Sequence, residues 1–325
     1  MRKNTILFIP AVALAGALVN PQQWIGENGG TSKADARGKI VEVSLRSSWI
    51  ADSDLQALST FQDLHRLDLS HTRITDLGFR ELKPLTQITD LNLYYAEQIG
   101  DGALAVIRNW RNLKRLNLRG TKVTDAGVEQ LAEHPALESL DVGFSLFTDG
   151  GFQALTSIPN LKELAAGGNK VTDVGLNSLR LMPNLRVLDL NGAQRTDSGL
   201  WAATVTDRGL DAIATLKQLE ELYLRGAKIT NTGSGKLAAL QKVKVLDLGE
   251  TQLSEAGLKF LSQLPELERL SLYGCKRVDD SVIPALESIR KLQWVDLTGT
   301  GLTPQAISRL RKSKPNCSIL WEPVS

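Results

Sequence analysis

Side chains that could perform catalysis are few in this chain. Its 325 residues include three histidines, His65, His71 and His134, and two cysteines, Cys275 and Cys317. Acid–base and nucleophilic chemistry require such groups beside a second reacting side chain, and a metal site requires them at ligand spacing. The sequence has no glycine-rich phosphate loop, no His or Cys pair at metal spacing and no serine elbow motif. We therefore predict no catalytic residues, no metal and no cofactor.

Side chains suited to binding are more prominent. Tyr, Trp and Arg combine a large contact area with polar tips, and for this reason they dominate protein interfaces. These residues form two groups in the sequence. The first cluster is Tyr94, Tyr95, Arg115, Asn117, Arg119 and Phe144. The second cluster is Tyr223, Arg225, Arg269, Tyr273 and Trp294.

A repeated phrase of about 24 residues positions both clusters. Leu-x-x-Leu-x-Leu, a small or polar residue, and then (Ile/Val)-Thr-Asp-x-Gly-Leu recur in eleven versions from Ile40 onward. One such unit cannot bury its own apolar stripe, so the units must stack into a solenoid. The first positions of the repeats are Ile40, Leu64, Ile88, Leu113, Leu137, Leu161, Leu185, Leu219, Val243, Leu267 and Leu292.

Each repeat changes its hydrophobic period once. Leu116 and Leu118 alternate with polar residues, which predicts a strand with one buried face. The segment from Val123 to Leu131 has apolar residues at helical spacing behind Thr124 and Asp125, which predicts a short capped helix. We expect a parallel concave sheet, short convex helices and inward-facing ninth positions. The third, fifth, seventh and eighth positions, which carry both clusters, then face the concave side.

The residues resemble a known family. Segments 64–76 and 246–251 are similar to leucine-rich repeat proteins of the ribonuclease-inhibitor-like or cysteine-containing type, in its bacterial form. The resemblance implies an α/β horseshoe of about 11 repeats over 40–316, with an N-terminal cap over 20–39 and a C-terminal cap over 317–325. Family members include nuclease inhibitors and F-box proteins. We find no helical F-box segment ahead of the repeats and do not expect that function.

The first 19 residues have the order of a signal peptide. Arg2 and Lys3 precede an apolar stretch from Ile6 to Val19 that contains small residues at signal-peptidase spacing. The stretch is too short for a permanent membrane span. Export to the periplasm or beyond the cell is one interpretation, and an apolar N-terminus on a cytoplasmic protein is the other, which Pro10 favours.

Composition narrows the class of partner. The chain is 23% charged and 42% hydrophobic, with a formal net charge of +2. No apolar run reaches the 18 or so residues of a membrane span, and the concave positions carry more acidic groups than arginines. We therefore expect neither a membrane span nor nucleic-acid binding. The oligomeric state is not predicted.

Acidic residues recur at the fifth position of the repeats. Calcium requires six to eight oxygens around one point, whereas these carboxylates stand singly on separate strands, so we expect a solvated column. His71 lies near Asp68 and Asp90 without a nucleophile, and we interpret it as a solvated histidine. The column comprises Asp68, Asn92, Asn117, Asp141, Asp189, Asp247 and Asp296.

Three further features are individual to this chain. Cys275 and Cys317 are almost two repeats apart, too far for a disulfide, so we expect free thiols. Small residues between the clusters predict a saddle where a partner could approach the backbone, although glycine also serves the turn after a strand. The saddle residues are Gly143, Ala165, Gly167 and Gly168.

The third feature is an insertion in the seventh repeat. Thr196-Asp197-x-Gly-Leu is echoed by Thr206-Asp207-x-Gly-Leu, and Val205 favours the second copy as the helix start. The segment from Gln194 to Thr204 should leave the sheet edge as a loop with Leu200 and Trp201 at its tip, and loops on rigid scaffolds often carry recognition. A partial duplication without a function is the other interpretation.

These features together predict a non-enzymatic scaffold that binds a protein or peptide on its concave face. The alternative from another class is a carbohydrate-binding module in which Tyr94, Tyr95 and Tyr273 stack on sugar rings. A structural role, in which aromatic and arginine side chains only stack on neighbouring strands, is also open.

Overall fold

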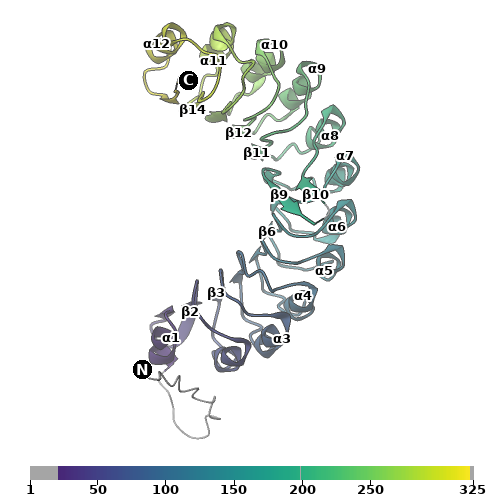
Figure 1. Ribbon diagram of the computed structural model, residues 1–325, viewed down its shortest axis with the longest axis vertical. Coiled ribbons are helices and arrows are strands. Elements are labelled where there is room, and N and C mark those ends of the chain that lie inside the picture. Colours follow the sequence, from purple (N-terminus) through teal and green to yellow (C-terminus); the bar gives the residue numbers. More distant parts are fainter. Residues whose placement is uncertain (1–20, 198, 323–325) are drawn as a thin grey trace, which may run out of the picture.

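The computed structural model describes residues 21–197 and 199–322. The chain forms an open arc, with the strands along its inner side, the helices along its outer side and the termini at opposite ends (Figure 1). The expected signal peptide lies outside the described residues. Among the described residues, no helix is both long and apolar enough to cross a lipid bilayer.

Thirteen strands of the described chain form one sheet. Equivalent positions of successive repeats pair in parallel, as Arg66 does with Asp90 and Asp90 with Arg115. The register also holds across the 34-residue interval, where Val187 pairs with Glu221. The sheet order is β1 (Thr31–Ala34), β2 (Ile40–Ser44), β3 (Arg66–Asp68), β4 (Asp90–Asn92), β5 (Arg115–Asn117), β6 (Ser139–Asp141), β7 (Glu163–Ala165), β8 (Val187–Asp189), β11 (Glu221–Tyr223), β12 (Val245–Asp247), β13 (Arg269–Ser271), β14 (Trp294–Asp296) and β15 (Ser318–Leu320).

Two of these strands lie outside the repeats and close the sheet. β1 pairs antiparallel with β2, and β15 pairs parallel with β14. The remaining eleven are the repeat strands, so the predicted solenoid and its register are confirmed.

Short helices follow the strands on the convex side. A threonine N-cap precedes most of them, as the Thr-Asp phrase predicts; the Thr148 hydroxyl, for example, accepts the N–H of Gly150. The α-helices are α1 (Pro21–Glu27), α2 (Leu55–Leu58), α3 (Asp76–Phe79), α4 (Asp101–Ile107), α5 (Asp125–Glu129), α6 (Asp149–Ala154), α7 (Asp173–Leu176), α8 (Asp207–Ile213), α9 (Asn231–Ser234), α10 (Glu255–Leu258), α11 (Ile283–Ser288) and α12 (Pro304–Ser313). The 3-10 turns are η1 (Asp52–Asp54), η2 (Arg80–Leu82), η3 (Leu155–Ser157), η4 (Asn177–Leu181), η5 (Gly235–Ala239), η6 (Lys259–Gln263) and η7 (Asp280–Val282).

The core lies between the sheet and the helices, where the repeated leucines and isoleucines are buried. Most ninth-position residues also point inward, as predicted, and seven of the eleven donate to main-chain carbonyls that the strand leaves unpaired. The Thr72 hydroxyl donates to Leu69 O at 2.7 Å, and the Asn169 amide donates to Val142 O at 2.7 Å. A small polar residue at this position therefore satisfies buried carbonyl groups.

A ladder of carboxylates joins the convex ends of the repeats. In seven of the ten contacts between successive repeats, an aspartate accepts two hydrogen bonds from the threonine of the next repeat, one from its N–H and one from its hydroxyl. Asp125 binds Thr148 in this way at 2.7 Å for both bonds, and Asp207 binds Thr230 at 2.8 and 2.6 Å. The aspartate of the Thr-Asp phrase therefore forms hydrogen bonds with the next repeat.

The glycine of the same phrase leaves room for that carboxylate. A Cβ built on Gly233 would lie 1.9 Å from Oδ1 of Asp207, and one built on Gly175 would lie 2.4 Å from Oδ1 of Asp149. Asp54 and Val282 replace the glycine in two repeats that no such carboxylate precedes, whereas Ala103 and Ala306 replace it where Asp76 and Asp280 make the contact. Seven glycines share this position: Gly78, Gly127, Gly151, Gly175, Gly209, Gly233 and Gly257.

The insertion is a hairpin. Thr206 caps α8, so the prediction that the second Thr-Asp copy starts the helix is confirmed. β9 (Ala193–Thr196) pairs antiparallel with β10 (Gly199–Ala202), and Figure 1 shows both at mid-arc. The prediction that Leu200 and Trp201 form the tip is wrong. They belong to β10, because the chain already reverses between Thr196 and Gly199, where glycine has a φ of +112°.

The carboxylate ladder predicts that one substitution changes the free energy of unfolding in opposite directions in two backgrounds. Gly233→Ala in the wild-type chain should lower the free energy of unfolding by about 1–3 kcal/mol, because the new Cβ overlaps the Asp207 carboxylate. In an Asp207→Ala background the same change should be neutral or stabilising by up to about 1 kcal/mol, because alanine favours the helix. Urea unfolding of the four proteins measures this coupling. An equal cost in both backgrounds would show that the glycine serves another purpose.

Candidate functional site

The concave sheet forms the floor of a long groove. A cavity of about 820 Å³ runs over the strands from β1 to β11 and is lined by third- and fifth-position side chains. Arg115 and Asn117 of the first cluster lie on this floor, and Tyr223 of the second cluster lies at its end. The other members of the first cluster lie outside the cavity, where the strands end.

The fifth-position column is not simply solvated, and in this respect the prediction is wrong. Each side chain turns back to accept the N–H two residues later, as Asp68 does from Ser70 at 2.9 Å and Asp141 from Gly143 at 2.8 Å. These bonds end the strands, which explains why Asp and Asn recur there. No group of three or more His, Cys, Asp or Glu side chains in the described chain could hold a metal ion.

Burial changes the acidity of the central carboxyls. It raises the pKa of Asp141, against the opposing effects of the Arg119 guanidinium and the Gly143 N–H. It also raises the pKa of Asp189, where the Asn191 N–H opposes it. The pKa of Tyr223 is raised by burial and by the bond from its hydroxyl to Glu221 Oε2 at 2.6 Å. The floor is therefore acidic but partly neutralised by its own donors.

The eighth position has a left-handed backbone in all eleven repeats, which lie within the described residues. Six repeats place glycine there, with φ values from +67° to +111°. The other five are Ser47, His71, Tyr95, Phe144 and Glu250, with φ values from +51° to +58°. A bulky side chain in this region is uncommon and costs roughly 1–2 kcal/mol. Tyr95 and Phe144 therefore occupy positions that the fold itself would assign to glycine.

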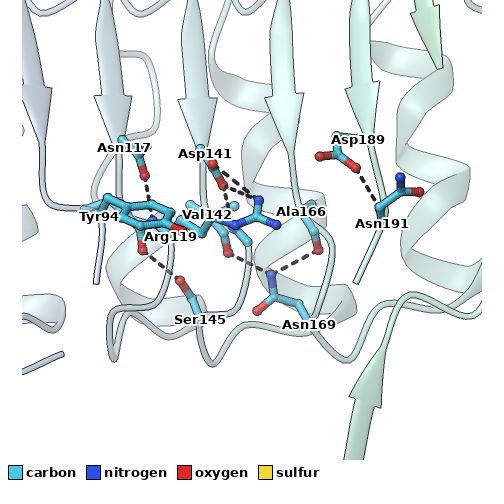
Figure 2. Close-up of polar contacts among 12 residues, drawn as sticks. Tyr94, Asn117, Arg119, Asp141, Val142, Ser145, Ala166, Asn169, Asp189 and Asn191 are labelled. Carbon is cyan, nitrogen blue, oxygen red and sulfur yellow. Dashed lines mark hydrogen bonds and ion pairs between the residues drawn. The ribbon is translucent and has the colours of Figure 1, made fainter. Parts of the chain in front are cut away.

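Five side chains at successive strand ends form two packed groups, His71 with Tyr94 and Tyr95, and Arg119 with Phe144. We call these five residues together the strand-end ledge. The Tyr95 ring stacks with His71 at 5.8 Å between centroids and meets Tyr94 edge-on at 4.7 Å. The Arg119 guanidinium lies 4.6 Å from the Phe144 ring centroid. Figure 2 shows Arg119 extending toward Asp141 on the neighbouring strand, at 3.4 Å.

The predicted small-residue saddle is not open. A Cβ on Gly143 would lie 2.7 Å from the Arg119 guanidinium, and one on Gly168 would lie 2.9 Å from the Phe144 ring. A Cβ on Gly167 would overlap the main-chain oxygen of Asn191. The glycines are small because the ledge side chains of preceding repeats and the following turn cover them. That contact crosses repeats, so the spacing of residues within one repeat gave no sign of it.

The second cluster is held by cation–π contacts. Arg225 lies 4.9 Å from the Tyr273 ring centroid, and Arg269 lies 5.1 Å from that of Trp294. Four of its members, Tyr223, Arg225, Arg269 and Trp294, line a smaller cavity of about 300 Å³. The structure therefore brings the residues of the second cluster together, as predicted. It also shows their side chains stacking on neighbouring strands, as the alternative structural role requires.

The remaining sequence candidates lie apart from both clusters or carry no chemistry. Leu200 is 69% exposed on the hairpin, and Trp201 beside it is partly buried. His71 belongs to the ledge and not to a catalytic group. Cys275 is buried, Cys317 is partly exposed, and both are free. Burial raises the pKa of both thiols, so neither is activated as a nucleophile.

Comparison with known proteins identifies the fold. The Leucine Rich repeat family model matches residues 62–82 and 111–132. The internalin InlF of Listeria monocytogenes superposes with a TM-score of 0.63 at 23% identity, over 84% of this chain and 71% of that one. No curated protein matches the sequence.

A plant receptor has the same architecture. The leucine-rich repeat ectodomain of the Arabidopsis receptor kinase HAESA, in complex with an N-terminally extended IDA peptide hormone, superposes with a TM-score of 0.60 at 17% identity. The match covers 90% of this chain and 47% of that chain, so this protein spans about half the length of that receptor chain. A second HAESA structure, with IDA and the co-receptor SERK1, gives 0.55 at 18% identity, over 93% and 48% of the two chains. At these identities the comparisons establish the fold alone.

The left-handed backbone predicts an order of stability at position 95. Tyr95→Ala removes the ring but keeps the strained Cβ, whereas Tyr95→Gly removes both, so the glycine variant should be more stable by about 1 kcal/mol. Tyr94, which has no positive φ, is the matched control, and there glycine should be the less stable of the two. Thermal unfolding of the four variants tests this. If the alanine and glycine variants had the same order of stability at positions 94 and 95, backbone strain at Tyr95 would be contradicted.

Proposed function

We propose that this leucine-rich repeat solenoid is a non-enzymatic scaffold that recognises a protein or peptide partner on its concave side. One observation carries the proposal. Tyr95 and Phe144 hold a backbone conformation that costs stability, at positions where six other repeats use glycine. Strain that the fold does not require is commonly retained for function.

The surroundings of these two residues support a binding role. Tyr, Phe and Arg of the ledge are already ordered by stacking, so little side-chain entropy is lost when a partner covers them. The floor beside the ledge offers the acidic column and Arg115, which pairs with Asp90. A partner can therefore find apolar and charged contacts on one continuous surface.

The scaffolds with the same fold are consistent with this role. The HAESA structure holds a peptide hormone on its leucine-rich repeat ectodomain. We extend the proposal to the ribonuclease-inhibitor-like class, because a helical turn follows the strand in each repeat, and to export of the protein through its N-terminal segment. Partner-binding residues are proposed to be the two clusters, with Leu200 and Trp201 of the hairpin as a further contact.

Affinity capture from the native organism tests the proposal. The bait variant combines Tyr94→Ala, Tyr95→Gly and Arg119→Ala, with glycine at position 95 to avoid backbone strain. We expect it to lose at least about 90% of the captured partner while its melting temperature changes little, because ledge contacts are interface anchors. The matched control replaces exposed apolar residues away from the ledge, Leu77, Val174 and Leu181, by alanine.

Two outcomes would contradict the proposal. Capture that is equal for the ledge variant and the control would place the interface elsewhere. Retention of the wild-type protein on immobilised glycans, lost in the ledge variant, would favour the carbohydrate-binding alternative.

A further inference from the structure

The rim beside the ledge carries an unpaired basic row. The tenth position of each repeat lies at this rim, and its register is fixed by main-chain bonds such as Lys122 N to Ile99 O and Lys228 N to Val205 O. In the two 25-residue repeats, which have one extra residue here, the equivalent position is the eleventh, Gln98 and Arg277. Every second repeat places a basic residue at this position, and uncharged residues occupy it in the repeats between, although Glu97 precedes Gln98. The row is Arg73, Lys122, Lys170, Lys228 and Arg277, all of them exposed.

These five cations make no ion pair with a carboxylate in the described part of the chain. Lys122 donates to the Gln98 amide oxygen at 3.1 Å, and Arg73 lies 5.5 Å from the Trp49 ring centroid. At the opposite rim, where the strands begin, basic residues pair across repeats, as Lys162 does with Glu138 and Lys244 with Glu220, both at 2.7 Å. The chain thus neutralises one rim internally and leaves the other basic.

The charge of the whole strand-end rim confirms this asymmetry. The segments from the seventh to the tenth positions, with the inserted residues, contain ten basic residues and three acidic ones, Glu97, Asp197 and Glu250. Two of the ten, Arg119 and Arg225, pair with Asp141 and Asp247 of the column, which leaves eight basic residues against three acidic ones. The complete chain has 38 basic and 36 acidic residues. A surface with this excess attracts and orients an acidic partner.

From this complementarity we infer that the strand-end rim binds an acidic segment of a partner protein in an extended conformation. The inference rests on the proposed function, since it assumes a protein partner, and it names the class and the path of that partner. The segment crosses the repeats from Arg73 to Lys170, with the Tyr95 and Phe144 rings beneath it. The hairpin, anchored by Gln194 to Ser145 O at 2.7 Å and Gly168 O at 2.8 Å, bounds the path.

The spacing of the row fits such a segment. Basic residues two strands apart are separated by about 10 Å. Three residues of a polyproline II segment advance about 9.3 Å, so a carboxylate at every third residue meets each cation in turn. Aromatic surfaces are the usual platform for this conformation. Nucleic acid fits less well, because one strand brings a phosphate about every 3.4 Å.

The test uses defined probes. Fluorescein-labelled (Glu-Pro-Pro)5 should bind the full-length protein in an anisotropy titration, more weakly as salt rises from 50 to 500 mM, and (Glu-Gly-Gly)5 should bind less tightly. Lys122→Glu with Lys170→Glu should weaken binding by about tenfold, because two attractions become repulsions. The control, Lys83→Glu with Lys114→Glu, makes the same charge change at two exposed residues away from the rim and should change affinity less than about twofold.

Several results would overturn the inference. They are no binding of (Glu-Pro-Pro)5, equal binding of (Lys-Pro-Pro)5, equal affinity of the rim and control variants, or tighter binding of a single-stranded oligonucleotide. The salt dependence of (Glu-Pro-Pro)5 binding is measured on the wild-type protein, so this part of the test does not depend on the folding of a variant. If capture still depends on the ledge while the acidic probe fails, the proposed function stands and only the acidic class is wrong.

Discussion

The repeats depend on one recurring hydrogen-bonded contact, in which an aspartate of one convex turn accepts the N–H and hydroxyl of the next repeat's threonine at seven of the ten junctions. Asp52 to Thr75, Asp125 to Thr148 and Asp280 to Thr303 show the same pair of bonds along the solenoid. The contact fixes the spacing on the convex side, while the parallel strands fix it on the concave side. With both sides fixed, the fold makes few demands on the residues of the concave rim.

Several residue types at the strand-end rim are therefore not required by the fold. Its left-handed eighth position accepts glycine without cost, yet this chain places Tyr95 and Phe144 there and covers glycines of later repeats with their rings. Its tenth position is exposed, yet basic residues occur in every second repeat. The fold alone favours glycine at the eighth position and has no preference at the tenth. Binding of a partner accounts for the residues at both positions.

Much of the architecture could be predicted from the sequence, because the period sets the strand register, the buried leucines and the Thr206 helix start. The covered saddle could not, because the direction in which Arg119 and Phe144 lean across repeats is decided by packing. The chain reversal between Thr196 and Gly199 could not be distinguished from a longer loop. The left-handed position had a visible signal in the sequence, because six of the eleven repeats have glycine at the eighth position. The basic row was missed since the concave positions alone were counted.

Site-specific photo-crosslinking tests the central claim most directly. Benzoylphenylalanine placed at position 144, on the ledge, should crosslink the captured partner through an acidic segment identifiable by mass spectrometry. The same probe at Val174, which is 72% exposed away from the ledge, should give no crosslink. Crosslinking from position 174 alone, or equally from both positions, would contradict a partner bound at the strand ends.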